Sequence, residues 1–381
     1  MYDSVPQQHH ALLPRPAHDE QARQLFAQDM RRYILLDLPR QTRKVFEHGV
    51  KPRLAAADPE RAGDHRAVRD ALWEQGFLRA TTGLQRISQE LLWNSVVPYV
   101  ERNAGRINAE VEALASAPGE GSLTLDPDFT VPAYLTEVDI HCMPGNYHAQ
   151  YGPGDAVQGA VFDRGAFIYG LGGVGELHDG VAGALIAALR ERYPDLDPAR
   201  IVDLGCTIGH NTLPLCDAFP NAEVHAVDAA APMLRYAHGR ARALHKPVHW
   251  HQADVRATGF PDGHFDLIVS SILFHEVHPD EIPAVLAECH RLLAPGGVMA
   301  HLDIPDYFRS PDPLFVAMVD ADHFHNNEPF WGGFHKMDLE SMMVEAGFPA
   351  DAVFRGVAPL DGFPWSFFGA QKAAEAKVRA A

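Results

Sequence analysis

The stretch that most constrains this chain is residues 201–211, where an apolar run ends in an acid and glycines follow. Residues 201–204 predict a buried parallel strand, and residues 211–217 can begin a helix. Gly205 and Gly209 between them allow a tight turn and a close approach of the backbone to a ligand. A strand, a glycine turn and a helix in this order are typical of nucleotide-binding βαβ units.

A second apolar run, residues 224–228, ends in Asp228 about twenty residues further on. At this spacing a carboxylate meets the ribose hydroxyls of a bound nucleotide. Asp203, however, precedes the first glycine and would repel a pyrophosphate, and the third glycine of the dinucleotide motif is missing. These features argue against an NAD-dependent oxidoreductase. They suit a ligand with a positive group and no phosphates, such as the amino-acid end of S-adenosylmethionine.

On these residues, the segment from 201 to about 304 resembles the core of class I S-adenosylmethionine-dependent methyltransferases, close to the small-molecule and ubiquinone-biosynthesis type. The family pattern is Asp-x-Gly-x-Gly-x-Gly, and Thr207 replaces its middle glycine. The resemblance implies S-adenosylmethionine as cofactor and methyl transfer to an oxygen or carbon nucleophile of a small organic molecule. A non-methylating S-adenosylmethionine-binding protein stays the alternative, because a fold does not fix a function.

The fold class expected is α/β, a doubly wound Rossmann-like sheet preceded by an α-helical amino-terminal region. Parallel strands are predicted at 201–205, 223–227, 247–251, 265–270 and 298–303. Helices are predicted at 180–192, 211–218, 231–243, 279–293 and 338–346. Two strand-like runs, 352–357 and 365–371, resemble the antiparallel hairpin that closes the family's seven-stranded sheet.

The chain divides into four predicted regions: a poorly ordered tail (1–18), a helical amino-terminal region (19–120), an irregular lid or linker (121–175) and the methyltransferase domain (176–373). In the second region apolar residues recur at helical spacing over 19–46, 65–76 and 82–115. Within the last region, residues 304–336 form an insertion that we place on the substrate side.

The resemblance also implies a set of cofactor-binding residues: Tyr169, Asp203, Gly205, Cys206, Thr207, Gly209, Asp228, Ala229, Met233, Asp254, Val255 and Ser270. Asp228 should accept hydrogen bonds from both ribose hydroxyls, and Asp254 one from the adenine amino group. Tyr169 is expected at the methionine part, and Ser270 close to the departing methyl group.

His275 follows the fourth predicted strand and precedes a helix begun by Pro279, so we place it beside the acceptor. This loop resembles that of small-molecule O-methyltransferases, in which a His-Asp-Trp supplies a general base, although Glu276 and Val277 replace Asp and Trp here. A histidine suits removal of an acidic proton near neutral pH. The alternative is that His275 only shapes the acceptor pocket.

Residues 320–331 of the insertion are dense in acids, histidines and aromatic residues. We expect Phe330 and Trp331 to form a wall of the acceptor pocket. No metal site is assigned, because His323 and His325 would point to opposite faces of an extended segment. A transition-metal site in this insertion remains an alternative.

Composition excludes other classes of function. Fifty acids against 32 bases give a formal charge of -18, which opposes nucleic-acid binding. The four cysteines show no paired spacing, so reduced thiols and a cytoplasmic location are expected. No apolar run reaches the roughly 18 residues of a membrane span. The partner expected is therefore a small-molecule acceptor, and the oligomeric state stays open, with a homodimer among the options.

Overall fold

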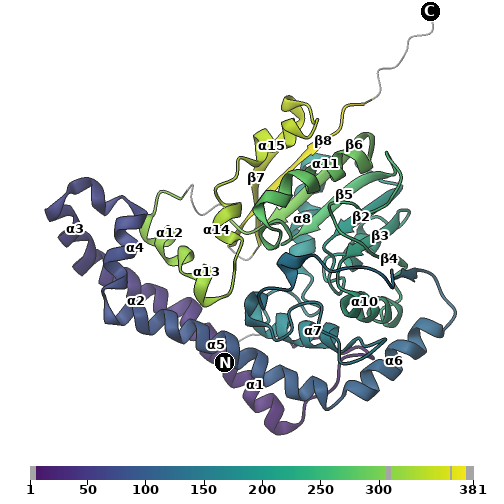
Figure 1. The fold of residues 1–381 in the computed structure, drawn as a ribbon, viewed down its shortest axis with the longest axis horizontal. Helices are drawn as coiled ribbons and strands as arrows, with labels where there is room; N and C mark the ends of the chain where they lie inside the picture. The colour runs from purple at the N-terminus through teal and green to yellow at the C-terminus, as the bar shows by residue number, and fades with distance from the viewer. Residues whose placement is uncertain (1–5, 306–309, 361–362, 375–381) are drawn as a thin grey trace, which may run out of the picture.

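The computed structural model describes residues 6–305, 310–360 and 363–374. Across these residues one sheet of eight strands runs in the order β1-β4-β3-β2-β5-β6-β8-β7 (Figure 1). The strands are β1 (Ser122–Thr124), β2 (Arg200–Leu204), β3 (Glu223–Asp228), β4 (Val248–Gln252), β5 (Phe265–Ser271), β6 (Leu293–Asp303), β7 (Val353–Leu360) and β8 (Phe363–Gln371). Pairing is parallel from β1 to β6, whereas β8 is antiparallel to β6 and β7.

The doubly wound α/β sheet is confirmed, but the expected number of strands was one too low. The extra strand is β1, which pairs Ser122 with His249 at the open edge of β4. Three residues are too few to show an alternating pattern, so only the tertiary pairing reveals the strand. The strand order reverses at β2 and β5, which places a crevice for ligands at their carboxyl ends.

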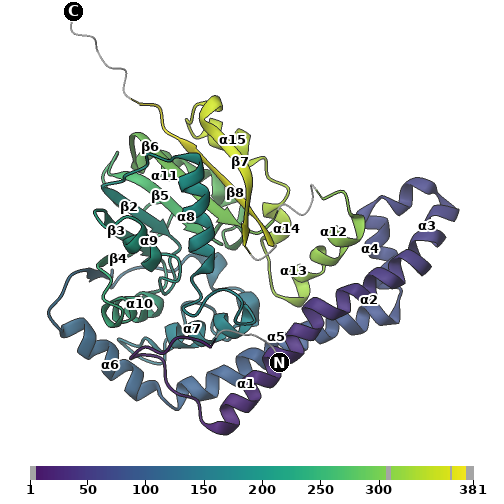
Figure 2. The ribbon, with the colours of Figure 1, turned by 180° about the vertical axis from the view of Figure 1, so that it is seen from behind.

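Helices cover both faces of the sheet, as the two opposite views in Figure 1 and Figure 2 show. One face carries α7 (Val157–Tyr169), α8 (Gly180–Arg192), α9 (Leu213–Ala218) and α10 (Ala231–Ala243). The other carries α11 (Ile282–Leu292) and α15 (Leu339–Glu345). Each layer buries its own apolar cluster, with Trp250 in the first and Phe265 in the second, both without exposed surface.

The amino-terminal region forms a helical arm, as expected, that extends along one side of the molecule (Figure 1). Its helices are α1 (His18–Arg32), α2 (Leu38–Val45), α3 (Lys51–Ala57), α4 (His65–Trp73), α5 (Gly76–Glu101) and α6 (Ala104–Ser116). Widened π turns at Tyr33–Asp37 and Phe46–Val50 join the first three helices. Each π turn ends two residues before a proline, Pro39 or Pro52, which lacks an N–H and crowds the preceding turn. Among the described residues, no helix has both the length and the apolar character to cross a membrane.

Helix α7 lies in the segment that the sequence predicted to be irregular. It is buried nearly all round, so it has no polar face to create a helical period. Gly159 and Gly165 weaken the helix signal further, yet a Cβ at either would lie 2.2 Å from Tyr236 or 2.0 Å from Trp93. The glycines therefore allow neighbouring helices to pack closely against α7.

Residues 6–17 of the predicted tail pack against the protein, and residues 1–5 lie outside the described residues. Leu12 is fully buried, and the side chains of Gln7 and His10 each reach a carboxylate oxygen of Asp163 at 2.9 Å. Asp163 is itself buried on α7, so its charge needs these partners. The order of this segment depends on a helix that the sequence did not predict.

The insertion is also more regular than expected. It contains α12 (Pro313–Asp320), α13 (Asp322–His325) and α14 (Trp331–Phe334), and α12 packs against α4 of the arm. The prediction of an extended segment at His323 and His325 was therefore wrong. The polar and aromatic residues of the insertion show no helical period. Contacts with the arm, such as those of α12 with α4, determine their conformation.

Candidate functional site

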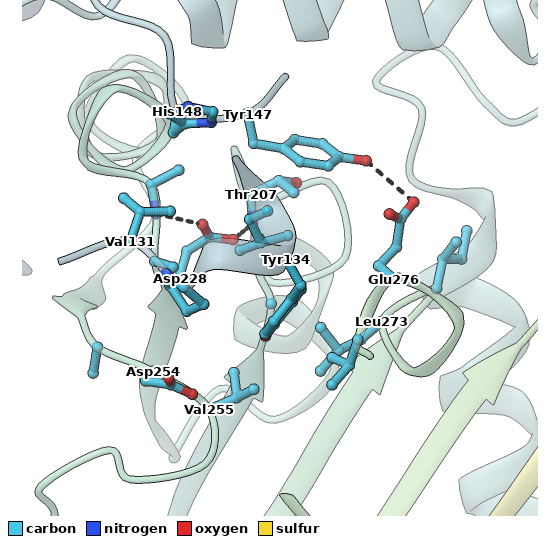
Figure 3. Close-up of a pocket in the computed structure, with 18 residues that line it drawn as sticks. Val131, Tyr134, Tyr147, His148, Thr207, Asp228, Asp254, Val255, Leu273 and Glu276 are labelled. Atoms are coloured by element: carbon cyan, nitrogen blue, oxygen red, sulfur yellow. Dashed lines mark hydrogen bonds between the residues drawn. The ribbon is translucent and has the colours of Figure 1, made fainter. Parts of the chain in front are cut away.

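A pocket of about 670 Å³, partly open to solvent, lies at the carboxyl ends of β2, β3, β4 and β5 (Figure 3). Residues that follow these strands form its floor: Gly205, Thr207, Asp228, Ala229, Ala230, Ala253, Asp254, Val255, Ile272, Leu273, Glu276 and Val277. Residues that precede α7 cover it: Val131, Pro132, Tyr134, Leu135, Tyr147 and His148.

The turn after β2 is held in a conformation that favours glycine. Gly205 and Gly209 have positive φ angles of 70° and 84°. A Cβ at Gly205 would lie 2.5 Å from Leu273, and one at Gly209 would lie 2.6 Å from Trp250. Thr207 also has a positive φ, 47°, so this residue stores backbone strain where the family pattern has glycine.

Asp228 ties this turn to the end of β3. One carboxylate oxygen accepts a hydrogen bond from the Thr207 amide and the other from the Ala230 amide, both at 2.8 Å. Burial raises the pKa of Asp228, and these backbone hydrogen bonds oppose that shift. A carboxylate oxygen can accept more than one hydrogen bond, so Asp228 can still accept from ligand hydroxyls.

Asp254 follows β4 and also lines the floor of the pocket. Its two oxygens accept from Arg256, whose guanidinium also pairs with Glu281 at 2.7 Å. Figure 3 shows Asp254 and Val255 on the loop below Asp228. Asp254 is therefore fixed in place by an arginine before any ligand binds.

Residues 201–297 match a family model described as a methyltransferase domain. The chain is 33% identical over 171 residues to demethylmenaquinone methyltransferase of Thermus thermophilus, 44% of this chain and 74% of that protein. It is 35% identical over 200 residues to malonyl-[acyl-carrier protein] O-methyltransferase of Methylococcus capsulatus, 49% of this chain and 69% of that protein. To trans-aconitate 2-methyltransferase of an Azoarcus species it is 39% identical over 123 residues, 32% of this chain and 46% of that protein.

The chain belongs to the S-adenosylmethionine-dependent methyltransferases. The expected cofactor is therefore S-adenosylmethionine, and the expected reaction is methylation of a small molecule. The matched part is the sheet domain, and the chain spans about half the length of some of the relatives, such as the aconitate enzyme. The arm, the cover of the pocket and the whole insertion lie outside the family model.

Six residues of the predicted cofactor set line this methyltransferase's pocket: Gly205, Thr207, Asp228, Ala229, Asp254 and Val255. Five others are buried and are not among the residues that line the pocket: Asp203, Cys206, Gly209, Met233 and Ser270. The Asp203 carboxylate accepts a hydrogen bond from the Thr212 hydroxyl at 2.6 Å, and burial raises the pKa of Asp203 to about 7. The Ser270 hydroxyl lies 2.8 Å from Nδ1 of His301, inside the sheet layer. Asp203 and Ser270 therefore hold neighbouring segments of the sheet domain together.

Tyr169, the twelfth residue of the set, is not among the residues that line the pocket. Its ring lies between the guanidinium of Arg31, 3.9 Å from the ring centroid, and the ring of His141 at 5.2 Å. Its hydroxyl accepts from the Asn326 amide at 3.1 Å. The sequence placed Tyr169 near the methionine part of the cofactor, but the structure places it with the arm and the insertion.

His275 is buried, and it is not among the residues that line the pocket. Its Nδ1 lies 2.5 Å from the Asp303 carboxylate at the end of β6, and its Nε2 lies 3.7 Å from Glu276. Burial alone would lower the pKa of His275, but the Asp303 carboxylate outweighs burial and raises it to about 9. The neighbouring carboxylates therefore favour the protonated form of this histidine at neutral pH.

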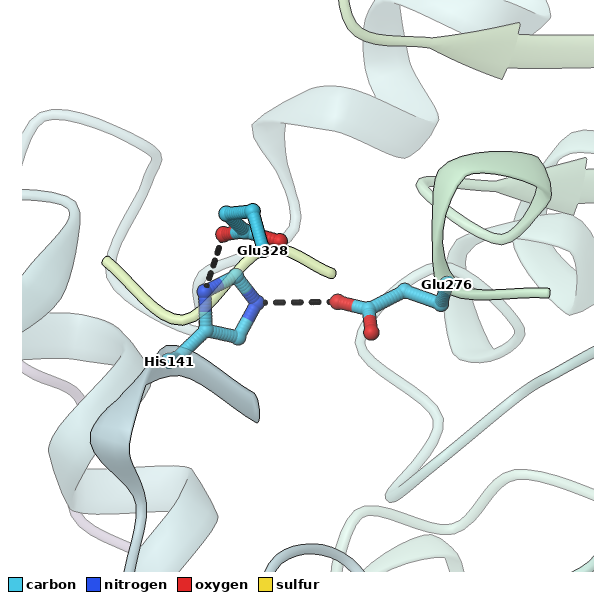
Figure 4. Close-up of side chains that lie close together, drawn as sticks. All are labelled: His141, Glu276 and Glu328. Carbon is cyan, nitrogen blue, oxygen red and sulfur yellow. Dashed lines mark ion pairs between the residues drawn. The ribbon is translucent and has the colours of Figure 1, made fainter. Parts of the chain in front are cut away.

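Beyond Glu276 lies a cluster that the sequence did not reveal. His141 lies between two carboxylates, with Nε2 3.0 Å from Glu276 and Nδ1 2.7 Å from Glu328 (Figure 4). The Tyr147 hydroxyl donates to the same Glu276 oxygen at 3.3 Å, which links the cluster to the pocket (Figure 3). Burial opposes the charging of His141, but Glu328 and Glu276 hold its pKa well above the ordinary value.

Phe330 and Trp331 do not line the pocket themselves but pack against residues at its acceptor end. The Phe330 ring packs edge-on against Tyr134, which lines the pocket, at 5.8 Å between centroids. Trp331 packs against the imidazole of His275 at 5.7 Å. Both therefore support residues of the predicted acceptor side, and neither is among the residues that line the cofactor pocket.

Sequence reasoning missed the residues that cover the pocket. Tyr134, Tyr147 and His148 come from the segment predicted as an irregular lid, and no motif marks them. Glu276 was noticed only as a departure from the His-Asp-Trp pattern. A usable signal was its acidity, since Glu276 keeps a carboxylate beside His275 where the O-methyltransferase pattern has Asp.

Proposed function

We propose that this methyltransferase transfers the methyl group of S-adenosylmethionine to an oxygen or carbon nucleophile of a small acceptor at the Glu276 end of the pocket. The observation that carries the proposal is one pocket that runs from the glycine turn and Asp228 to Glu276 and Tyr147. In this reading the turn binds the methionine part, Asp228 the ribose hydroxyls and Asp254 the adenine amino group. The acceptor then approaches from the insertion side.

The reaction needs little from the protein beyond alignment. The acceptor nucleophile forms a bond to the methyl carbon, the carbon–sulfur bond breaks, and its electron pair neutralises the sulfonium. Holding donor and acceptor in line can supply roughly 7–11 kcal/mol at best. The segment at 131–148 covers the pocket, which supports its proposed role as a lid that excludes water.

The relatives suggest where to search for the acceptor. They are named for demethylmenaquinone, malonyl-[acyl-carrier protein] and trans-aconitate, so quinones and carboxylic acids are the first acceptors to test. Purified protein should form S-adenosylhomocysteine with at least one acceptor of these classes. The protein could instead bind the cofactor and methylate neither these acceptors nor any compound in a wider metabolite extract. That result would favour the non-methylating alternative.

A cytoplasmic location and a homodimer are further proposals. The four cysteines form no disulfide, which supports a reducing compartment. Apolar side chains on α1, including Phe26 at 63% exposed, support burial against a second copy. Light scattering during gel filtration measures the mass directly, and a monomer at micromolar concentration would contradict the homodimer.

A further inference from the structure

We propose that His141, Glu276 and Glu328 form a binding site for a divalent transition-metal ion at the acceptor end of the pocket. One ligand atom from each of the three residues lies within 4.8 Å of the other two. They come from three separate segments: the cover of the pocket, the loop after β5 and the insertion. The sequence assigned no metal and considered only the histidines within the insertion.

The charges of the cluster call for a cation. His141 carries at most one positive charge against two carboxylates, and the neighbouring His275 is already paired with Asp303. The set therefore keeps a net negative charge even when both histidines are protonated. The side chains of His141, Glu276 and Glu328 are only 16%, 9% and 1% exposed. An uncompensated charge in such a place is costly, and a divalent ion with a neutral histidine would balance both carboxylates.

One carboxylate oxygen is available for such an ion. Oε2 of Glu328 is buried and has no hydrogen-bond partner, and it lies on the side facing Glu276 (Figure 4). Nε2 of His141 and Oε1 of Glu276 are 3.0 Å apart. Two ligands at about 2.1 Å from one ion are separated by this distance when they subtend about a right angle. The spacing of this pair therefore fits coordination as well as it fits a proton, and Glu328 completes the set once its free oxygen turns toward the ion.

The ligands are held in place by further hydrogen bonds. The carbonyl of His141, in a left-handed turn with φ 56°, accepts from Gln89 at 3.0 Å and Trp93 at 2.7 Å. The Asn326 amide donates to Glu328 at 2.8 Å, and the Tyr147 hydroxyl donates to Glu276. Such partners orient the ligands of metal sites before the ion arrives.

The donor set favours a first-row transition ion such as Mn²⁺, Fe²⁺, Co²⁺ or Zn²⁺ over Mg²⁺, because one ligand is an imidazole nitrogen. Three protein ligands leave positions open for water or substrate. Because Glu276 also lines the cofactor pocket, an acceptor oxygen could occupy one of them. This last step rests on the proposed function and narrows the acceptor to one with a carboxylate or enolate oxygen.

The test is titration of the full chain, freed of metal by a chelator, with Co²⁺ alone, followed by visible absorption and calorimetry. We expect one high-affinity ion per chain. Glu328→Gln keeps the shape but removes the charge, and it should weaken that site at least about 10-fold, the lower bound for loss of even an outer-shell partner. If this variant does not fold by circular dichroism, Glu276→Gln replaces it, with the same expected loss.

A second histidine cluster provides the matched control. His225 and His249 lie 3.4 Å and 3.6 Å from Glu223 on the sheet and could bind ions adventitiously. His249→Gln should leave the high-affinity site unchanged. Absence of a high-affinity site, its loss in His249→Gln, or equal affinity in the parent and the glutamate variant would each overturn the proposal.

Two more measurements separate this proposal from the proposed function. Binding of S-adenosylhomocysteine is measured on the same samples: cofactor binding without the ion contradicts only the metal site, and ion binding without the cofactor contradicts only the methyltransferase reading of the pocket. Mn²⁺ with malonate as probe tests the open positions. Malonate should lower the water proton relaxation by the bound ion, and an unchanged relaxation would exclude acceptor coordination.

Discussion

The end of the pocket at the glycine turn takes its groups from residues 205–254, whereas the end at Glu276 also needs His141 and Glu328, from distant parts of the chain. The first end binds with backbone amides and short acids at strand ends. The second is a buried set of opposite charges held by long side chains. Local sequence can specify the first kind of site, but the second exists only when the cover of the pocket, the insertion and the sheet domain come together.

The largest effect expected at the first end is loss of cofactor affinity in Asp228→Ala. The variant loses two charge-assisted hydrogen bonds to the ribose, each worth roughly 1.5–3 kcal/mol, and two bonds that tie down the turn. Calorimetry with S-adenosylmethionine should show affinity lower by a factor of about 10² or more. Asp254→Ala, at the adenine end, serves as the comparison and should lose less. Equal affinity in Asp228→Ala and the parent would contradict the proposed role of Asp228, at the end of β3, in binding the ribose.

At the second end, His275→Ala should lower turnover by roughly 10²–10⁴ if His275 is a general base, with cofactor affinity nearly unchanged. Because Asp303 raises the pKa of His275 to about 9, a base must first lose its proton, so the parent's rate should rise with pH toward about 9. Rates against pH for the parent and the variant decide this. A higher KM with turnover retained and the same pH profile would instead give His275 a role in shaping the pocket.

Asp203 offers a test of stability at the first end. Its pKa in the folded protein, about 7, is above the value of about 3.9 expected when unfolded. Its contribution is therefore fully present below about pH 4 and is lost as pH rises to about 7. Asp203→Asn has no charge to bury, so its free energy of unfolding should exceed the parent's by on the order of 2–4 kcal/mol at pH 8 and by little at pH 4. Urea unfolding at both pH values measures this difference. An equal difference in free energy of unfolding at pH 4 would show that ionisation of Asp203 is not the cause of the difference.

The smallest effect concerns Thr207. Thr207→Gly removes a left-handed strain of about 1–2 kcal/mol but adds freedom to the unfolded chain worth about 0.4–1 kcal/mol. We expect a net gain in stability of at most about 1 kcal/mol and cofactor affinity that is equal or slightly higher. Ala230→Gly, at the other residue whose amide donates to Asp228, controls for the added glycine. A clear loss of affinity in Thr207→Gly would show that the threonine side chain itself contacts the ligand.

Much of the sheet domain followed from the sequence because its signals are local. Neighbouring residues and backbone conformation are enough to specify three of its features. These are the apolar runs of strand length, the glycine turn at 205–209 and the acid Asp228 at the end of a strand. Helix α7 escaped prediction because a helix buried on all sides has no polar face. Strand β1 escaped because three residues carry no period.

The sequence by itself therefore determined the fold class, the family and the residues that line the glycine-turn end of the pocket. Only the tertiary structure decided that Tyr169 faces His141 instead of the cofactor pocket, that His275 is paired with Asp303, and that Glu276 and Glu328 share one histidine. The physical reason is the range of the interactions. Turns and strand ends are set by residues close in the chain, whereas a buried charge takes its partner from whichever segment folding brings beside it.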